Sequence, residues 1–190
     1  MNARRIALIG AAAAALAVMF GPSPAPAGAA TATLGIDYDL DGSPPPVPPR
    51  LGRLDLYRPD GAAAGDRRPI VLYVHGGGWA TGDKANAIAD KVELFTGAGY
   101  LFASVNYRLS PDPIDPSFPA GRIRFPDHPD DVGEAIGWID RNVAAYGGDP
   151  SRIILIGHSA GAHVVALVAT DPRYVSRWGV EHRHLIGAVP

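Results

Sequence analysis

Short hydrophobic runs recur along the chain and are separated by segments of helical or irregular character. Four of these runs are apolar at nearly every position, which is typical of strands buried on both faces of a parallel sheet. They span residues 69–74, 101–107, 153–156 and 185–189. The segment 54–57 alternates apolar and polar side chains instead, and this period of two also predicts a strand.

Three segments between these runs predict helices. The first spans 85–98, where apolar residues recur at helical spacing. The second begins at Asp127, which we expect to cap the helix, and it carries an apolar stripe on one side. The third spans 160–170. This alternation of strands and helices predicts an α/β fold with a mostly parallel sheet and helices on both faces.

Proline and glycine divide the rest of the chain, which holds 19 Pro and 23 Gly in 190 residues. The Pro-rich stretch 42–49 cannot pair inside a sheet, so we interpret residues 31–50 as an extended lead-in to one domain over 51–190. Five prolines lie within 110–126, which predicts a long irregular loop. Loops of this length often form a wall or lid of a binding site.

The first 30 residues have the order of a secretory signal. Arg4 and Arg5 precede an apolar run over 6–20, and small residues then offer cleavage sites after Ala27, Ala29 or Ala32. The alternative is a membrane anchor, but a run of about 15 residues is short of the ~20 that a spanning helix needs. We therefore expect a signal peptide over 1–30, no stable membrane span, and a secreted or periplasmic protein.

Composition narrows the functional classes. The formal net charge of −2 and the absence of a basic run argue against a nucleic-acid partner. The chain has no Cys, so it has neither a disulfide nor a thiolate metal site.

Residues 157–161, Gly-His-Ser-Ala-Gly, match the motif G-x-S-x-G. In this motif the serine sits on a sharp turn between a strand and a helix, which makes it a nucleophile. Its small neighbours have a steric reason, since a side chain two positions away on either side would clash within so tight a bend. Because an apolar run precedes the motif and a predicted helix follows it, we expect Ser159 to be a catalytic nucleophile rather than part of an ordinary glycine turn.

A second motif, His75-Gly-Gly-Gly-Trp79, follows another predicted strand. Consecutive glycines let backbone N–H groups approach a substrate closely, and such donors stabilise the oxyanion of a tetrahedral intermediate. The alternative is a phosphate-binding loop, but that would require a Lys-Ser/Thr ending or a G-x-G-x-x-G opening a helix. The carboxyl ends of two strands therefore carry the two halves of one predicted site.

Five motifs in order resemble the carboxylesterase branch of the α/β-hydrolases, which includes hormone-sensitive-lipase-like, feruloyl-esterase-like and arylformamidase-like proteins. They are His75–Trp79, Val105-Asn-Tyr-Arg-Leu109, Phe125-Pro126 with Asp131, Tyr146-Gly-Gly-Asp-Pro150 and Gly157–His163. The resemblance runs from about Leu54 to the end of the chain. It is specific for the superfamily and much less so for the substrate.

The resemblance implies a role for individual residues. Ser159 would be the nucleophile, and the N–H groups of Gly77, Gly78 and Ala160 would form the oxyanion hole. His75 would brace its loop, and Asp131 would make a structural contact near the serine. A small-molecule ester would be the substrate, with no metal or organic cofactor.

The acid and base of the triad are not evident. In this fold they follow the nucleophile in the order Asp or Glu, then His. The candidates after Ser159 are Asp171, Glu181, His182 and His184, but a helix of about eleven residues carries the chain some 17 Å away first. We expect all four to be surface residues. His163, one turn into that helix, is expected to pack or lie at the surface.

His128 is an exception, because the sequence places it at the same sheet edge as Ser159, with three acidic residues nearby. It could in principle reach the serine, but a surface or capping role is favoured. We therefore expect a fold truncated after the helix that follows the nucleophile, and a fragment that lacks the triad Asp and His. The alternatives are a catalytically inactive, degenerate binding protein and an amide hydrolase of the arylformamidase type.

Overall fold

A six-stranded sheet in the order β1-β2-β4-β3-β5-β6 organises the structure. The computed structural model describes residues 30–42, 49–110 and 123–190. The strands are β1 (Thr31–Asp37), β2 (Arg53–Arg58), β3 (Arg68–Val74), β4 (Leu101–Val105), β5 (Gly148–Gly157) and β6 (Leu185–Val189). β3, β4, β5 and β6 are parallel, whereas β2 is antiparallel to both β1 and β4. The predicted α/β fold with a mostly parallel sheet is confirmed.

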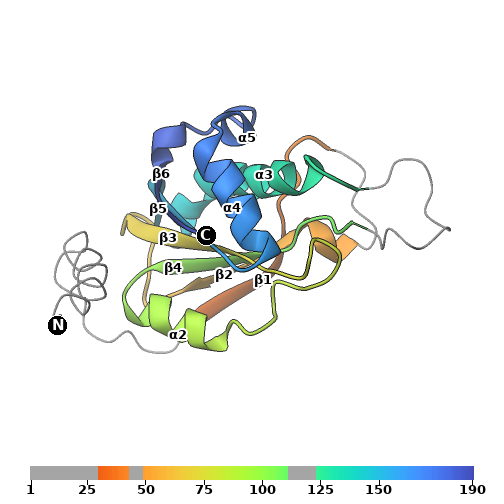
Figure 1. The fold of residues 1–190 in the computed structure, drawn as a ribbon. Coiled ribbons are helices and arrows are strands. Elements are labelled where there is room, and N and C mark those ends of the chain that lie inside the picture. The colour runs from red at the N-terminus through yellow and green to blue at the C-terminus, as the bar shows by residue number, and fades with distance from the viewer. Residues whose placement is uncertain (1–29, 43–48, 111–122) are drawn as a thin grey trace, which may run out of the picture.

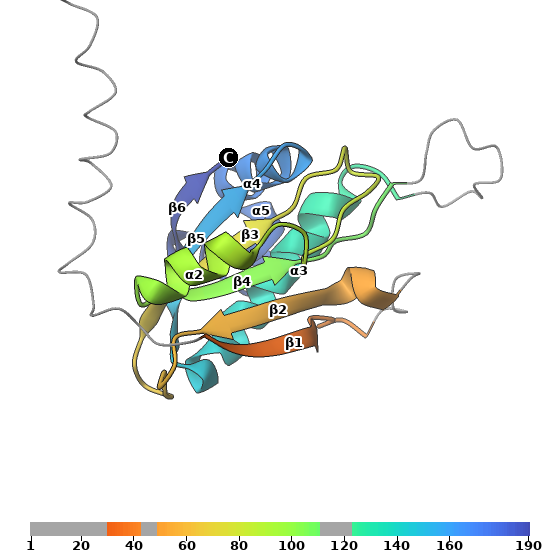
Figure 2. The ribbon, with the colours of Figure 1, turned by 90° about the horizontal axis from the view of Figure 1, so that it is seen from below.

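Helices cover both faces of this sheet (Figure 1). α2 (Ala89–Gly97) lies on one face, and α3 (Asp127–Asn142), α4 (Ala160–Thr170) and α5 (Arg173–Ser176) lie on the other. Figure 2 shows α2 crossing in front of the sheet with α3 behind it. Short 3₁₀ turns complete the described elements: η1 (Pro49–Gly52), η2 (Val143–Tyr146) and η3 (His182–His184).

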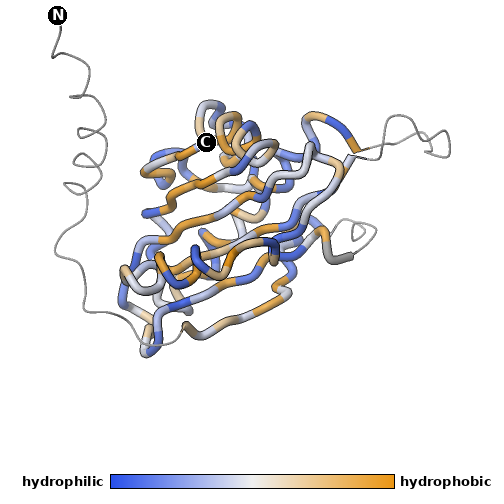
Figure 3. Tube along the Cα trace, turned by 60° about the horizontal axis from the view of Figure 1, so that its bottom comes forward, coloured by the Kyte–Doolittle hydropathy of each residue, from blue (hydrophilic) through white to orange (hydrophobic). Residues whose placement is uncertain are grey.

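The larger core lies between the sheet and the helix layer of α3, α4 and α5. The predicted apolar stripe is fully buried there: Val132, Ala135, Ile136 and Ile139 lie on α3, and Val143 is the first residue of η2. A smaller cluster under α2 contains Val71, Tyr73, Ile88 and Phe102. Figure 3 shows the hydrophobic residues running along the central strands, as expected for strands covered on both faces.

The sequence missed β1, because its pattern is that of an exposed edge. Five of its seven residues are exposed, and Gly35 interrupts it. Residues 31–37 are therefore a strand and not an extended lead-in. A signal cleavage after Ala32 would remove the first two residues of this strand. Residues 1–29 of the expected signal peptide lie outside the described residues. So do residues 43–48 of the Pro-rich stretch and residues 111–122 of the predicted loop 110–126.

One predicted helix start and one predicted helix cap were also wrong. The first helix begins at Ala89 rather than at residue 85, because Ala87 has a left-handed backbone with φ of 51°. The second begins with Asp127 inside the helix, and Pro126 is its N-cap residue. The Asp127 carboxylate accepts a hydrogen bond from the Arg124 N–H at 2.8 Å, so it closes the turn before the helix instead of capping it.

No helix in the described ranges has the length and apolar character that a bilayer crossing demands.

Candidate active site

Ser159 occupies a sharp turn between β5, which ends at Gly157, and α4, which begins at Ala160. Its backbone has φ of 54° and ψ of −117°, a combination that is costly for a residue with a side chain. The serine is exposed, whereas Ala160 behind it is buried. The turn thus presents the hydroxyl at the carboxyl end of a central strand, as the motif predicted.

The two glycines of the motif are required by close backbone contacts. A Cβ on Gly157 would lie 2.4 Å from the Gly161 carbonyl oxygen, and one on Gly161 would lie 2.2 Å from the Val74 carbonyl oxygen. Cβ atoms do not approach other atoms so closely, so the bend forms only with glycine at both positions. The steric reason inferred from the sequence therefore holds in the structure.

The loop over residues 76–82, called the glycine loop below, lies directly beside Ser159. A Cβ on Gly76 would be 3.0 Å from the Ser159 Cβ and 2.8 Å from the His158 carbonyl oxygen. The His158 N–H also donates to the Val74 carbonyl at 3.2 Å, which joins the two turns through the backbone. The two sequence motifs, about 80 residues apart, meet at one edge of the sheet.

The loop folds back on Gly77. Its carbonyl accepts hydrogen bonds from the N–H groups of Ala80 and Thr81 and from the Thr81 hydroxyl, at 3.0 to 3.1 Å. Gly77 has φ of 123° and Gly78 has φ of 60°, which are values that glycine adopts easily. The Gly77 carbonyl points into the loop, so the Gly78 N–H, on the opposite side of the same trans peptide group, points away from these contacts.

The three predicted oxyanion donors lie on the two turns that meet. Gly77 and Gly78 belong to the loop, and Ala160 is the first residue of α4. Within the described ranges, none of these three N–H groups donates to another residue. Helix N-termini favour negative charge, so Ala160 adds an electrostatic contribution at the same point.

His75 supports the loop from below. It is buried and stacks on Tyr107 with ring centres 4.6 Å apart. Its Nδ1 donates to the Gly76 carbonyl at 2.7 Å, and the Tyr107 hydroxyl donates to the His75 carbonyl at 3.0 Å. Burial raises the pKa of Tyr107 to about 12, so this hydroxyl keeps its proton. The bracing role expected for His75 fits these contacts.

A buried ion pair anchors the far end of the loop. The Lys84 ammonium donates to Asp55 at 2.7 Å, and the two side chains are 14% and 4% exposed. The Lys84 N–H donates to the Asn106 side chain at 2.6 Å, and the Lys84 carbonyl accepts from Ser104 at 2.7 Å. These contacts fix both the side chain and the backbone of Lys84, two residues after the glycine loop ends at Gly82.

We expect Lys84→Met to lower the free energy of unfolding by about 3–5 kcal/mol, because it leaves the Asp55 carboxylate buried without its cation. The exposed pair Asp171–Arg173 provides the control, and Arg173→Met should cost less than about 1 kcal/mol. Urea denaturation measures both. Equal losses in the two variants would contradict the importance given to the buried pair.

His128 does not contact Ser159. Its Nε2 lies 2.9 Å from the Ser110 hydroxyl, and its ring meets the Tyr107 ring edge to face at 6.0 Å. It is only 5% exposed, so the favoured surface or capping role was wrong: the residue is a buried packing group at the start of α3. Burial lowers its pKa, the charges of Arg108 and His163 act in the same direction, and Asp127 opposes them.

This lowered pKa predicts a loss of stability in acid. The unfolded chain takes up a proton near pH 6.5, but the buried imidazole resists it, so falling pH favours unfolding from about 6.5 downward. We expect His128→Gln to lose less stability than the wild type between pH 7.5 and 5.5, by at most about 1.4 kcal/mol per pH unit. Urea denaturation at both pH values measures this. An unchanged slope in His128→Gln would refute the assignment.

The remaining histidines and acids are occupied elsewhere. His163 is exposed and meets Trp79 edge to face, as the packing or surface role predicted. His182 lies 2.9 Å from the Ala169 carbonyl and His184 lies 2.8 Å from Asp140, beyond the far end of α4. Asp171 and Glu181 pair with neighbouring arginines. All six histidines lie in the described ranges, and no imidazole ring there is hydrogen-bonded to the Ser159 hydroxyl. His163 meets Ser159 through the backbone alone, its N–H donating to the Ser159 carbonyl at 3.2 Å.

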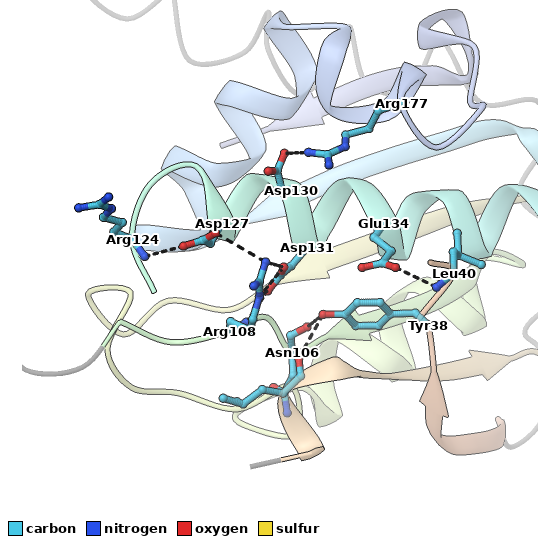
Figure 4. Close-up of polar contacts among 11 residues, drawn as sticks. Tyr38, Leu40, Asn106, Arg108, Arg124, Asp127, Asp130, Asp131, Glu134 and Arg177 are labelled. Carbon is cyan, nitrogen blue, oxygen red and sulfur yellow. Dashed lines mark hydrogen bonds and ion pairs between the residues drawn. The ribbon is translucent and has the colours of Figure 1, made fainter. Parts of the chain in front are cut away.

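Asp131 anchors the start of the loop that follows β4. It accepts hydrogen bonds from the Arg108 backbone N–H at 2.7 Å and from the Arg108 guanidinium at 2.5 to 2.9 Å (Figure 4). Burial raises the pKa of Asp131, and the Arg108 charge and hydrogen bonds oppose this. The role is structural, as expected, but the partner is Arg108 and not the serine turn.

The sequence assigned no role to Tyr107, Ser110 or Trp79, although all three lie in or beside the quoted motifs. Tyr107 supports His75, and Ser110 contacts both His128 and Trp79.

Three carboxylates, Asp39, Asp41 and Glu134, lie within 4.8 Å of one another, but two of them are exposed and such acidic groups are common on surfaces.

The strained serine turn, the glycine loop at its side and the parallel sheet that carries both define an α/β-hydrolase. Comparison with known proteins agrees. The BD-FAE family model matches residues 54–176, so the chain belongs to that family, a carboxylesterase group on the hormone-sensitive-lipase-like branch of the α/β-hydrolases.

Individual relatives are named esterases. Esterase LipQ of Mycobacterium tuberculosis is 37% identical over 120 residues, which cover 63% of this chain and 26% of LipQ. Carboxylesterase NlhH of the same species is 40% identical over 112 residues, which cover 58% of this chain and 31% of NlhH. The solved structure of the Thermogutta terrifontis esterase Est2 has a TM-score of 0.55 at 27% identity and covers 72% of this chain and 43% of Est2. The chain thus spans about a quarter to a third of the length of these curated relatives.

Proposed function

We propose that this protein hydrolyses small carboxylic esters through an acyl-enzyme on Ser159. The Ser159 hydroxyl attacks the ester carbonyl, the alcohol leaves with a proton, and water then releases the acid. The N–H groups of Gly77, Gly78 and Ala160 would stabilise the oxyanion formed in each half of the reaction. The observation that carries the proposal is the placement of Ser159, on a strained turn, against the glycine loop.

We place the acid and base of the triad in the part of the relatives' length that this chain does not match. None of the six imidazole rings forms a hydrogen bond with the Ser159 hydroxyl in the described ranges, and His182 and His184 lie beyond the far end of α4. A missing His would act first as base and then as acid. Sequencing of the transcript beyond codon 190 tests this, and the absence of a downstream Asp and His would count against it.

Covalent trapping tests the nucleophile without requiring turnover. A p-nitrophenyl phosphonate should lose one p-nitrophenolate as a P–O bond forms to Ser159, and peptide mass spectrometry should place the adduct on residues 157–161. An adduct on another serine, or no adduct on a folded chain, would defeat the assignment. The latter result would favour a catalytically inactive binding protein, since no imidazole ring is hydrogen-bonded to the Ser159 hydroxyl in the described residues.

We also propose that residues 1–30 direct export. The supporting observation is the order of Arg4-Arg5, an apolar run and small residues. Fractionation of cells that express the gene, with N-terminal sequencing of the product, tests it. Recovery of an uncleaved chain in the cytoplasm would overturn the proposal.

A further inference from the structure

Trp79 is held at two points by segments on either side of the site. Its ring meets His163 edge to face, with centres 5.5 Å apart and planes at 88°. Its carbonyl accepts a hydrogen bond from the Ser110 N–H at 2.7 Å. His163 belongs to α4, which starts next to Ser159, and Ser110 follows β4. One residue at the end of the triple-glycine segment therefore contacts two other segments of the site.

The backbone of Trp79 is strained. Its φ of 61° is in the left-handed region, which is uncommon for residues with a bulky side chain. Such a conformation persists only where the surrounding contacts impose it. Of the two contacts described above, the His163 ring contact depends on the indole, whereas any residue can accept the Ser110 hydrogen bond through its carbonyl.

The Ser110 contact is itself supported. The Ser110 hydroxyl lies 2.9 Å from Nε2 of the buried His128, and His128 packs on Tyr107, whose hydroxyl binds the His75 carbonyl. The glycine segment is thus braced at its start by Tyr107 and at its end by Ser110 and His163. The N–H groups of Gly77 and Gly78 lie between these two braces.

We propose that Trp79 is a positioning residue for the oxyanion site: its ring, held against His163, fixes the Gly77 and Gly78 peptide groups beside Ser159. This inference rests on the proposed function for its catalytic consequence. It explains why an indole, 37% exposed, occupies a backbone position that would otherwise favour glycine or asparagine. The contact joins the loop that carries two of the predicted donors to the helix that carries the third.

Two substitutions at Trp79 separate the ring from the backbone. Trp79→Asn tolerates the left-handed conformation but has no ring, whereas Trp79→Phe keeps a ring that can meet His163 and keeps the strain. His163→Phe and His163→Ala test the same contact from the other side. Trp138→Ala is the matched control, since it removes a partly buried indole that packs on Tyr146 near the other end of α3.

The first readout is independent of chemistry. Hydrogen exchange and NMR signals of the Gly77 and Gly78 amides should change in Trp79→Asn and His163→Ala, and should stay near the wild type in Trp79→Phe, His163→Phe and Trp138→Ala. If Trp79→Asn leaves both amides as they are in the wild type, or if Trp79→Phe perturbs them equally, the ring contact does not position the loop and the inference is overturned.

The second readout is the rate of phosphonate trapping at Ser159 in the full chain. A displaced donor should lower the limiting rate constant by about tenfold to a hundredfold in Trp79→Asn, with little change in the half-saturating concentration. A changed half-saturating concentration at a constant limiting rate would make Trp79 a wall of the substrate site and overturn the positioning role. If the wild type is not trapped while the amide effects appear as expected, the proposed function fails and the positioning of the loop stands.

Discussion

Ser159→Ala is expected to abolish release of p-nitrophenol from p-nitrophenyl acetate. The 190-residue chain should release about one equivalent per molecule slowly as Ser159 is acylated, because the oxyanion donors assist this step while the His base that would speed acylation and deacylation is missing. In the complete gene product, loss of the nucleophile should lower turnover by roughly 10³-fold or more. Alanine removes only the hydroxyl, so the effect isolates the oxygen that the turn presents.

The measurement is absorbance of p-nitrophenol against time at several chain concentrations. Ser176→Ala is the matched control, because it removes another exposed serine hydroxyl, on α5, and should leave release unchanged. Release that persists in Ser159→Ala at the wild-type level would assign the reaction to a different residue or to non-specific acylation. The fold would then remain, but the assignment of the nucleophile would not.

Gly161→Ala is expected to destabilise the protein by about 2–4 kcal/mol, although alanine is the better helix former. Residue 161 lies in the first turn of α4, where helix propensity alone favours alanine by about 1 kcal/mol. The added Cβ would, however, lie 2.2 Å from the Val74 carbonyl oxygen and 2.5 Å from that of His75. Both obstacles are backbone atoms, so the clash is relieved only by moving α4 away from β3 and the glycine loop.

Gly97→Ala is the control for this prediction. Gly97 is also helical, at the end of α2, and a Cβ there would meet no atom within 4 Å. This variant should be neutral or slightly more stable. Urea denaturation gives both free energies, and the opposite signs are the informative result. A gain of stability in Gly161→Ala would mean that the turn at Ser159 is less tightly packed than the contacts of Gly157 and Gly161 require.

The accuracy of the sequence predictions depended on how local their causes were. The apolar run 69–74 became β3 with nearly the predicted bounds and is mostly buried, as expected for a strand covered on both faces. The run 185–189 became β6 with the predicted bounds, but its predicted burial was wrong: three of its five residues are exposed, because β6 is the edge strand of the described sheet. α4 has the predicted bounds because the turn before it fixes its start. β1 was missed because an edge strand with exposed side chains has no apolar period to detect.

For the candidate site too, features with local causes could be predicted from the sequence and features with distant causes could not. The motif around Ser159 was readable because its requirement is steric and lies within five residues. His128 was not, because its burial depends on Tyr107 and Ser110, which precede it by about twenty residues across a long loop. The contacts of Asp131 with Arg108 and of Trp79 with His163 could not be predicted from the sequence either.

By itself, the sequence determined the parallel sheet, the bend at Ser159 and the presence of a glycine loop, because each follows from neighbouring residues alone. Only the tertiary structure decided that the loop lies against the serine, that His128 is buried away from it, and that Trp79 is held by His163 and Ser110. The physical reason is that such contacts depend on how strands and helices are stacked, and stacking is set by the whole core rather than by any one segment.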